Sequence, residues 1–100
     1  MIEEQMNIII AERKKKHMED DYGIQECWKK MINILAVDDC QTIEYLENCT
    51  WEELYYISEI IEDVSMQLQS KAYIQCLRML DRKFPELNMK KDIDLAEMYT

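Results

Sequence analysis

The sequence predicts an all-α protein: a compact bundle of about six helices joined by short loops. Gly and Pro occur once each in 100 residues, whereas an all-β protein needs many such residues in its tight turns. Apolar residues make up 48% of the chain, which is enough to form a core, and they recur three and four positions apart. One hundred residues suffice for one such core, so we expect a single domain over residues 1–100.

An acidic loop is expected between the first two helices. Residues 2–18 form the first predicted helix, and their basic end suits the negative pole of a helix dipole. Residues 18–23 carry three acids and the only glycine and are expected to form a loop. Residues 24–37 form the second predicted helix. Its apolar side chains recur at helical spacing: Ile24, Cys27, Trp28, Met31 and Leu35.

The third and fourth predicted helices begin at recognisable caps. Asp38 is expected to cap a short helix over residues 39–48. Thr50 is expected to cap a longer helix over residues 51–69, with the Glu53 side chain reaching back to the Thr50 amide. The longer helix has a clear core stripe. Its members are Leu54, Ile57, Ile61, Val64 and Leu68.

The last two predicted helices are separated by the only proline. Ser70 is expected to cap a helix over residues 71–84, which Pro85 ends because it cannot continue a helix. Asn88 is expected to cap a last short helix over residues 89–98.

The negative charge is concentrated in one third of the chain. Residues 38–70 contain nine acids and no Lys or Arg, and the whole protein has a net charge of −9. This charge argues against nucleic acid as a direct partner, and against an anionic membrane surface. It favours a basic protein partner, whose association would be accelerated by long-range attraction.

The candidate partner-binding residues follow from this charge and from helical geometry. The face opposite the core stripe of helix 51–69 is acidic and contains two tyrosines, which are common in interfaces. Its residues are Glu52, Tyr55, Tyr56, Glu59, Glu62 and Asp63. The acids of the preceding segment join them: Asp38, Asp39, Glu44 and Glu47. A charged helix face is often only a solvated face, but this one lacks the compensating bases that such a face usually carries.

No catalytic or metal site is expected. His17 is the only histidine and follows three lysines, and no nucleophile, metal or phosphate-binding motif is present. The four cysteines are too widely spaced for an ordinary structural zinc site and are expected to be reduced and mostly buried. We therefore expect a cytoplasmic protein that is not an enzyme and needs no cofactor.

Several segments resemble a known group of proteins. They are Thr50-Trp-Glu-Glu-Leu-Tyr-Tyr-Ile-Ser-Glu-Ile-Ile-Glu-Asp-Val-Ser, Leu68-Gln-Ser-Lys, Phe84-Pro-Glu-Leu, and the stretch from Cys27-Trp28 to Glu47-Asn48-Cys49. Over residues 22–98 the chain resembles small all-helical immunity proteins encoded beside polymorphic bacterial toxins, including those of contact-dependent growth inhibition. The shared features are structural rather than catalytic.

The resemblance implies a protein that binds and neutralises a cognate toxin domain in the cytoplasm. Such toxins are often basic nucleases that act on tRNA or DNA, so an acidic surface would imitate the phosphate charge of their substrate. The alternative is a self-associating helical adaptor or regulatory protein with no toxin partner, and a homodimer is compatible with either role. A third alternative is an enzyme or metalloprotein that uses the cysteines.

Overall fold

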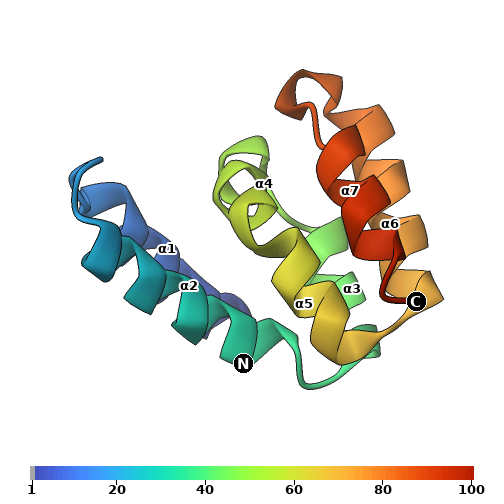
Figure 1. The fold of residues 1–100 in the computed structure, drawn as a ribbon, viewed down its shortest axis with the longest axis horizontal. Helices are drawn as coiled ribbons and strands as arrows, with labels where there is room; N and C mark the ends of the chain where they lie inside the picture. The colour runs from blue at the N-terminus through green and yellow to red at the C-terminus, as the bar shows by residue number, and fades with distance from the viewer. Residues whose placement is uncertain (1) are drawn as a thin grey trace.

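Three layers of helices make up the computed structural model, which describes residues 2–100 (Figure 1). Helices α1 (Ile2–Lys15) and α2 (Asp21–Leu35) form an antiparallel hairpin. The central layer contains α3 (Asp39–Glu47), α4 (Trp51–Ile57), the 3₁₀ turn η1 (Ser58–Ile60) and α5 (Ile61–Leu68). The third layer contains α6 (Lys71–Lys83), the 3₁₀ turn η2 (Pro85–Leu87) and α7 (Lys90–Glu97). The all-α prediction is confirmed, and no described helix is long and apolar enough to cross a membrane.

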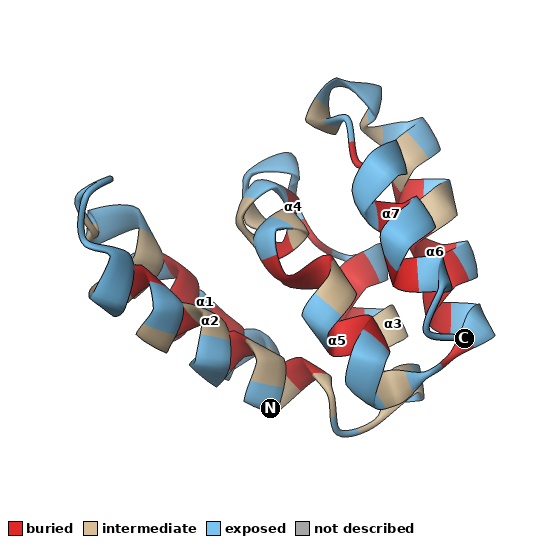
Figure 2. Cartoon of the chain, in the orientation of Figure 1, coloured by how far each residue is buried: buried red, intermediate tan, exposed pale blue. Residues whose placement is uncertain are grey.

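The core runs through all three layers and receives side chains from every α-helix (Figure 2). Met6, Met31, Leu54, Leu77 and Ile93 are each at most 1% exposed. Most residues of the predicted stripes are buried. The partly exposed ones lie at the edges of the core: Ile2, Trp28, Ile43, Leu68 and Phe84. Periodicity therefore located the core well, because an amphipathic helix buries the face that carries its apolar residues.

The predicted caps at Asp38, Thr50 and Ser70 are confirmed. The Thr50 hydroxyl accepts from the Glu53 amide at 3.2 Å, while the Glu53 carboxylate accepts from the Thr50 amide at 2.8 Å. The Asp38 carboxylate accepts from the Cys40 amide, and the Ser70 hydroxyl accepts from the Tyr73 amide. Each cap satisfies an amide that the first turn of its helix leaves without a partner.

The predicted loop over residues 18–23 is wrong at its end, because α2 already begins at Asp21. Asp20 caps the helix by accepting from the Gly23 amide at 3.0 Å. A Cβ atom at Gly23 would lie 2.4 Å from a carboxylate oxygen of Asp20. Gly23, which has no Cβ atom, therefore leaves room for the Asp20 side chain to cap the first turn of α2. The first helix is correspondingly shorter than predicted and ends at Lys15.

The predicted cap at Asn88 is also wrong. Asn88 has a φ of 52° and ends η2 in the left-handed conformation that asparagine tolerates better than most residues. The residue that precedes α7 is Met89, which makes no side-chain cap and is fully buried. The helix α7 therefore begins without a side-chain cap.

The fourth predicted helix, residues 51–69, is interrupted at η1. The Ser58 hydroxyl donates to the Tyr55 carbonyl at 2.6 Å and competes with the helical bonding of that carbonyl. Ile60 then departs from helical geometry with a φ of −125°. The expected core stripe survives the interruption, since Leu54, Ile57, Ile61 and Val64 are all buried, and Ile60, which the pattern did not include, is buried with them. The bend places η1 against α2.

The Glu59 carboxylate, at the centre of η1, joins the α1–α2 hairpin to the central layer. One of its oxygens accepts from Arg13 Nε at 2.9 Å and from Trp28 Nε1 at 3.0 Å, and the other accepts from Arg13 Nη2 at 2.7 Å. The side chains of Arg13 and Glu59 are only 16% and 25% exposed. A two-point Arg–carboxylate pair with this degree of burial is stronger than an ordinary surface ion pair.

We expect Glu59→Gln to lower the free energy of unfolding by about 2 kcal/mol, because a hydrogen bond to a charged group contributes roughly 1.5–3 kcal/mol. Denaturant unfolding measures this loss. Glu62→Gln is the matched control, because Glu62 has the same charge and forms no ion pair with a described residue. Its effect should stay within about 0.5 kcal/mol. Equal effects of the two substitutions would contradict this role for Glu59.

Candidate functional site

The carboxylates of α4 and η1 are largely turned toward α1. Glu59 is held by Arg13, and Glu52 forms an ion pair with Lys14. Tyr56 lies beneath the same bases, with the Arg13 guanidinium carbon 5.4 Å from its ring centroid. The absence of bases from residues 38–70 is therefore offset by tertiary contacts, because the basic end of α1 packs beside α4. Three of the predicted contact residues already have partners within the chain.

The other predicted carboxylates are not neutralised in this way. No Lys or Arg among residues 2–100 forms an ion pair with them. They fall into two groups, on α3 and on α5. The group on α3, here called the α3 acidic surface, consists of Asp38, Asp39, Glu44 and Glu47. The group on α5 consists of Glu62 and Asp63.

Trp51 and Tyr55 form an aromatic pair on the exposed side of α4. Their rings stack with centroids 5.9 Å apart, and the residues are 43% and 49% exposed. Tyr55 is exposed as the helical pattern predicts. Trp51, one helical turn earlier, is likewise half-exposed. Paired aromatic side chains of this kind supply contact area in protein interfaces.

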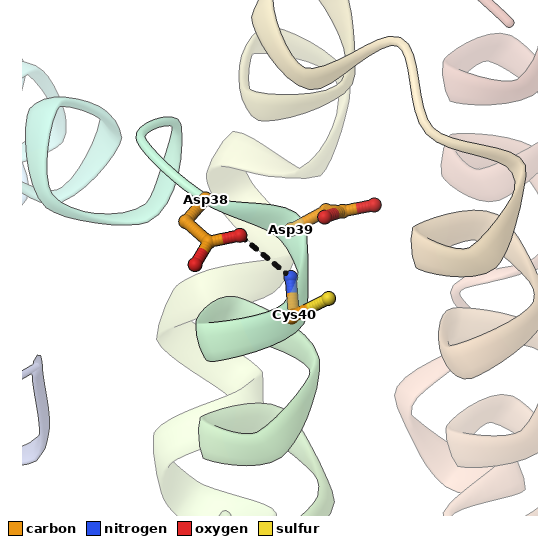
Figure 3. Close-up of side chains that lie close together, drawn as sticks. All are labelled: Asp38, Asp39 and Cys40. Carbon is orange, nitrogen blue, oxygen red and sulfur yellow. Dashed lines mark hydrogen bonds between the residues drawn. The ribbon is translucent and has the colours of Figure 1, made fainter.

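Asp38, Asp39 and Cys40 lie together at the start of α3 (Figure 3). Figure 3 shows the Asp38 carboxylate turned toward the Cys40 amide and the Asp39 carboxylate pointing away from it. The Ser70 hydroxyl donates to Asp39 at 2.8 Å and lowers the pKa of that carboxyl. Asp38 thus caps α3, and Asp39 joins α3 to the start of α6.

The four cysteines form no disulfide. Cys27, Cys49 and Cys76 are buried, as expected, and Cys40 is exposed. Burial raises the pKa of Cys49 to about 12 and that of Cys76 to about 11. The neighbouring carboxylates of Asp39 and Asp38 raise the pKa of Cys40. None of these environments favours the thiolate that a nucleophilic cysteine needs.

A recess of about 320 Å³ opens between α3 and the first turns of α1 and α4. One face of α3 lines it, because residues three and four positions apart share a side of a helix. The complete lining, here called the α3 recess, is Ile2, Glu3, Gln41, Glu44, Tyr45, Asn48 and Glu53. The acidic residues of this lining, Glu3, Glu44 and Glu53, come from three helices. A volume near 300 Å³ is at the lower end of the range for small-ligand sites.

Tyr45 is the buried part of the α3 recess. The residue is 8% exposed, and its hydroxyl has no hydrogen-bond partner within the described chain. Burial raises the pKa of Tyr45, and the charges of Cys49, Glu53 and Glu3 raise it further. A buried hydroxyl without a partner costs roughly 1–3 kcal/mol.

Of the recess residues, the sequence pointed only to Glu44 as a contact. Glu53 was explained by its cap, but that role uses one carboxylate oxygen and leaves the other available. Glu3 lies far outside the acidic stretch, and Tyr45 is one of several tyrosines without a distinguishing motif. The helical period of α3 relates Glu44 to Gln41 and Asn48. Only packing reveals that α1 and α4 complete the site.

We expect thiol reagents to modify Cys40 alone in the native protein, and more slowly than an unstructured thiol, because the two aspartates disfavour its thiolate. Mass spectrometry after timed alkylation at pH 8 measures this. Asp39→Asn should accelerate the reaction several-fold, whereas Asp92→Asn, a distant exposed control, should not. Rapid modification of Cys49 or Cys76 would contradict the buried environments described above.

Comparison with protein-family models, with curated proteins and with solved structures finds no match to this chain.

Proposed function

We propose that this chain is an immunity protein that binds and neutralises a cognate toxin domain, a basic nuclease, through the α3 acidic surface and the adjoining α3 recess. The observation that carries the proposal is the contrast between two sets of acids. Glu52 and Glu59 are neutralised by α1, whereas the acids of α3 have no cationic partner in the described chain. Unneutralised charge on one surface favours an external partner of opposite charge.

Electrostatics gives this surface a specific advantage in an immunity role. A protein that protects a cell must bind its toxin before the toxin reaches its substrate, so a high association rate is useful. Complementary charge raises association rates to about 10⁸–10⁹ M⁻¹s⁻¹ at low salt. The resemblance to immunity proteins points in the same direction, since a nuclease surface that binds phosphates would also attract carboxylates.

Stacked Trp51 and Tyr55 would supply apolar contact area from the exposed side of α4. Trp51 directly follows Thr50 and Tyr55 lies one turn later, whereas Glu53, which lines the α3 recess, faces the other side of α4. Interfaces depend on a few aromatic or Arg anchors surrounded by polar residues. In this arrangement the aromatic pair lowers the dissociation rate by burying its rings, while the α3 carboxylates raise the association rate.

Protection in cells tests the proposal directly. The C-terminal domain of the large secreted protein encoded immediately upstream is produced in a bacterial host with and without this chain. We expect the domain to stop growth when it is produced alone, and growth to be restored when both are produced and form an isolable complex. The proposal is overturned if no such upstream protein exists or if the chain gives no protection.

The double charge reversal Glu44→Lys with Glu47→Lys should slow association with that domain by about 10–100-fold at low salt, with a smaller effect at high salt because screening weakens long-range attraction. Stopped-flow or surface plasmon resonance measures the rate. Glu86→Lys with Asp92→Lys changes the net charge equally, at exposed residues outside α3. If this control slowed association as much, net charge rather than the α3 acidic surface would be responsible.

A further inference from the structure

The basic end of α1 already makes, on the acidic face of α4 and η1, the contacts that a basic partner would make there. Arg13 gives Glu59 a two-point contact, and Lys14 forms an ion pair with Glu52. Both bases also lie over the ring of Tyr56, with the guanidinium carbon of Arg13 5.4 Å and Nζ of Lys14 5.9 Å from its centroid. A carboxylate beside an aromatic face is a binding site for a cationic side chain, and two cations of this chain occupy it.

The two bases differ in how firmly they are held. The side chains of Arg13 and Glu59 are 16% and 25% exposed, and Trp28 donates to the same carboxylate. The side chains of Lys14 and Glu52 are 39% and 61% exposed. An exposed ion pair contributes little to stability, because solvent screens it. The Arg13 contact is therefore a fixed part of the fold, whereas the Lys14 contact is one that an outside base can replace.

We propose that Lys14 is a displaceable internal cover, and that an arginine side chain of the partner takes its place on Glu52 and Tyr56. This inference rests on the proposed function, because the arginine would belong to the toxin domain. A guanidinium pairs with a carboxylate at two points and stacks on an aromatic ring, whereas an ammonium is a point charge. Arginine therefore binds this site better than the lysine it displaces, and the ion pair lost in the exchange is an exposed one.

The exposed rings of α4 give the incoming side chain an apolar surface. Tyr55 meets Tyr56 edge-on with ring centroids 5.1 Å apart, and it stacks on Trp51 with centroids 5.9 Å apart. The methylene stem of an arginine packs on such a surface while its charged head pairs with a carboxylate. The three rings therefore form a row from the covered carboxylate to solvent, and the partner gains aromatic contact area in the step that displaces Lys14.

Lys14→Gln uncovers the site, and Lys15→Gln is its matched control. Lys15 is the next residue, is exposed and forms no ion pair with a described residue, so both substitutions remove one positive charge from the same turn. Each full chain is titrated with Nα-acetyl-arginine amide, and ¹H–¹⁵N NMR follows the amides of Glu52 and Tyr56. We expect Lys14→Gln to bind this probe at least about threefold more tightly than the unaltered chain, with little change in Tm.

The control Lys15→Gln should change the affinity for the arginine probe by less than about twofold. The uncharged citrulline analogue has nearly the same shape and should give no saturable shift with any of these chains. Equal gains in Lys14→Gln and Lys15→Gln would show that net charge alone is responsible and would overturn the proposal. Absence of saturable binding to Lys14→Gln would overturn it as well.

A second pair of variants tests whether the gain depends on Glu52. Lys14→Gln combined with Glu52→Gln should lose the gain, because the uncovered carboxylate is no longer present. Lys14→Gln combined with Glu62→Gln has the same net charge and should keep it, since Glu62 forms no ion pair with a described residue. Loss of the gain in both double variants would contradict the assignment of the site to Glu52.

The toxin domain tests the same exchange in the complex. Lys14→Gln should slow dissociation of the domain by about threefold or more, because no internal lysine competes for the site, whereas Lys15→Gln should leave the dissociation rate unchanged. Equal dissociation rates for Lys14→Gln and the unaltered chain would overturn the proposal. The two proposals fail separately. Absence of protection and of a complex overturns the proposed function, while the arginine titration measures displacement of Lys14 without any toxin.

Discussion

The carboxylate of Glu59 connects the α1–α2 hairpin to the central layer of this protein at one point. It receives both a two-point contact from Arg13 on α1 and the indole N–H of Trp28 on α2. The α1–α2 hairpin is thereby fixed against η1, and the basic end of α1 is brought beside α4. This position also allows Lys14 to reach Glu52 and leaves the first turn of α1 next to α3. The pairing of Glu52 with Lys14 depends on this position of α1, and so does the α3 recess, which includes Glu3 of α1.

Fixing α1 in this way divides the acids of residues 38–70 into two classes. Acids on α4 and η1 serve the fold, because they are neutralised by a helix from another layer. Acids on α3 and α5 have no ion-pair partner among the described residues. On α3 the fold uses two of them, since Asp38 caps the helix and Asp39 accepts a hydrogen bond from Ser70. Glu44 and Glu47 accept no side-chain hydrogen bond from a described residue and are exposed.

The proposed binding surface and the rigid junction therefore lie at different places on the molecule. Glu59 was one of the predicted contact residues, yet its side chain is held by Arg13 and Trp28 and is only 25% exposed. Glu44 was a secondary candidate and lines the α3 recess. The exposed pair Trp51 and Tyr55 adds apolar area on α4 without taking part in the core. A partner would thus meet carboxylates first and aromatic rings after contact.

The sequence by itself determined the all-α fold, most helix limits, the core stripes and the caps at Asp38, Thr50 and Ser70. These features depend on residues within a few positions of one another, so a local pattern contains them. Tertiary structure alone decided the pairing of Arg13 with Glu59, which are 46 positions apart, and the meeting of Glu3 with Tyr45 and Glu53 around one recess. Ion pairs and recesses arise from packing between distant segments, and a charge count along the chain cannot tell a neutralised carboxylate from an available one.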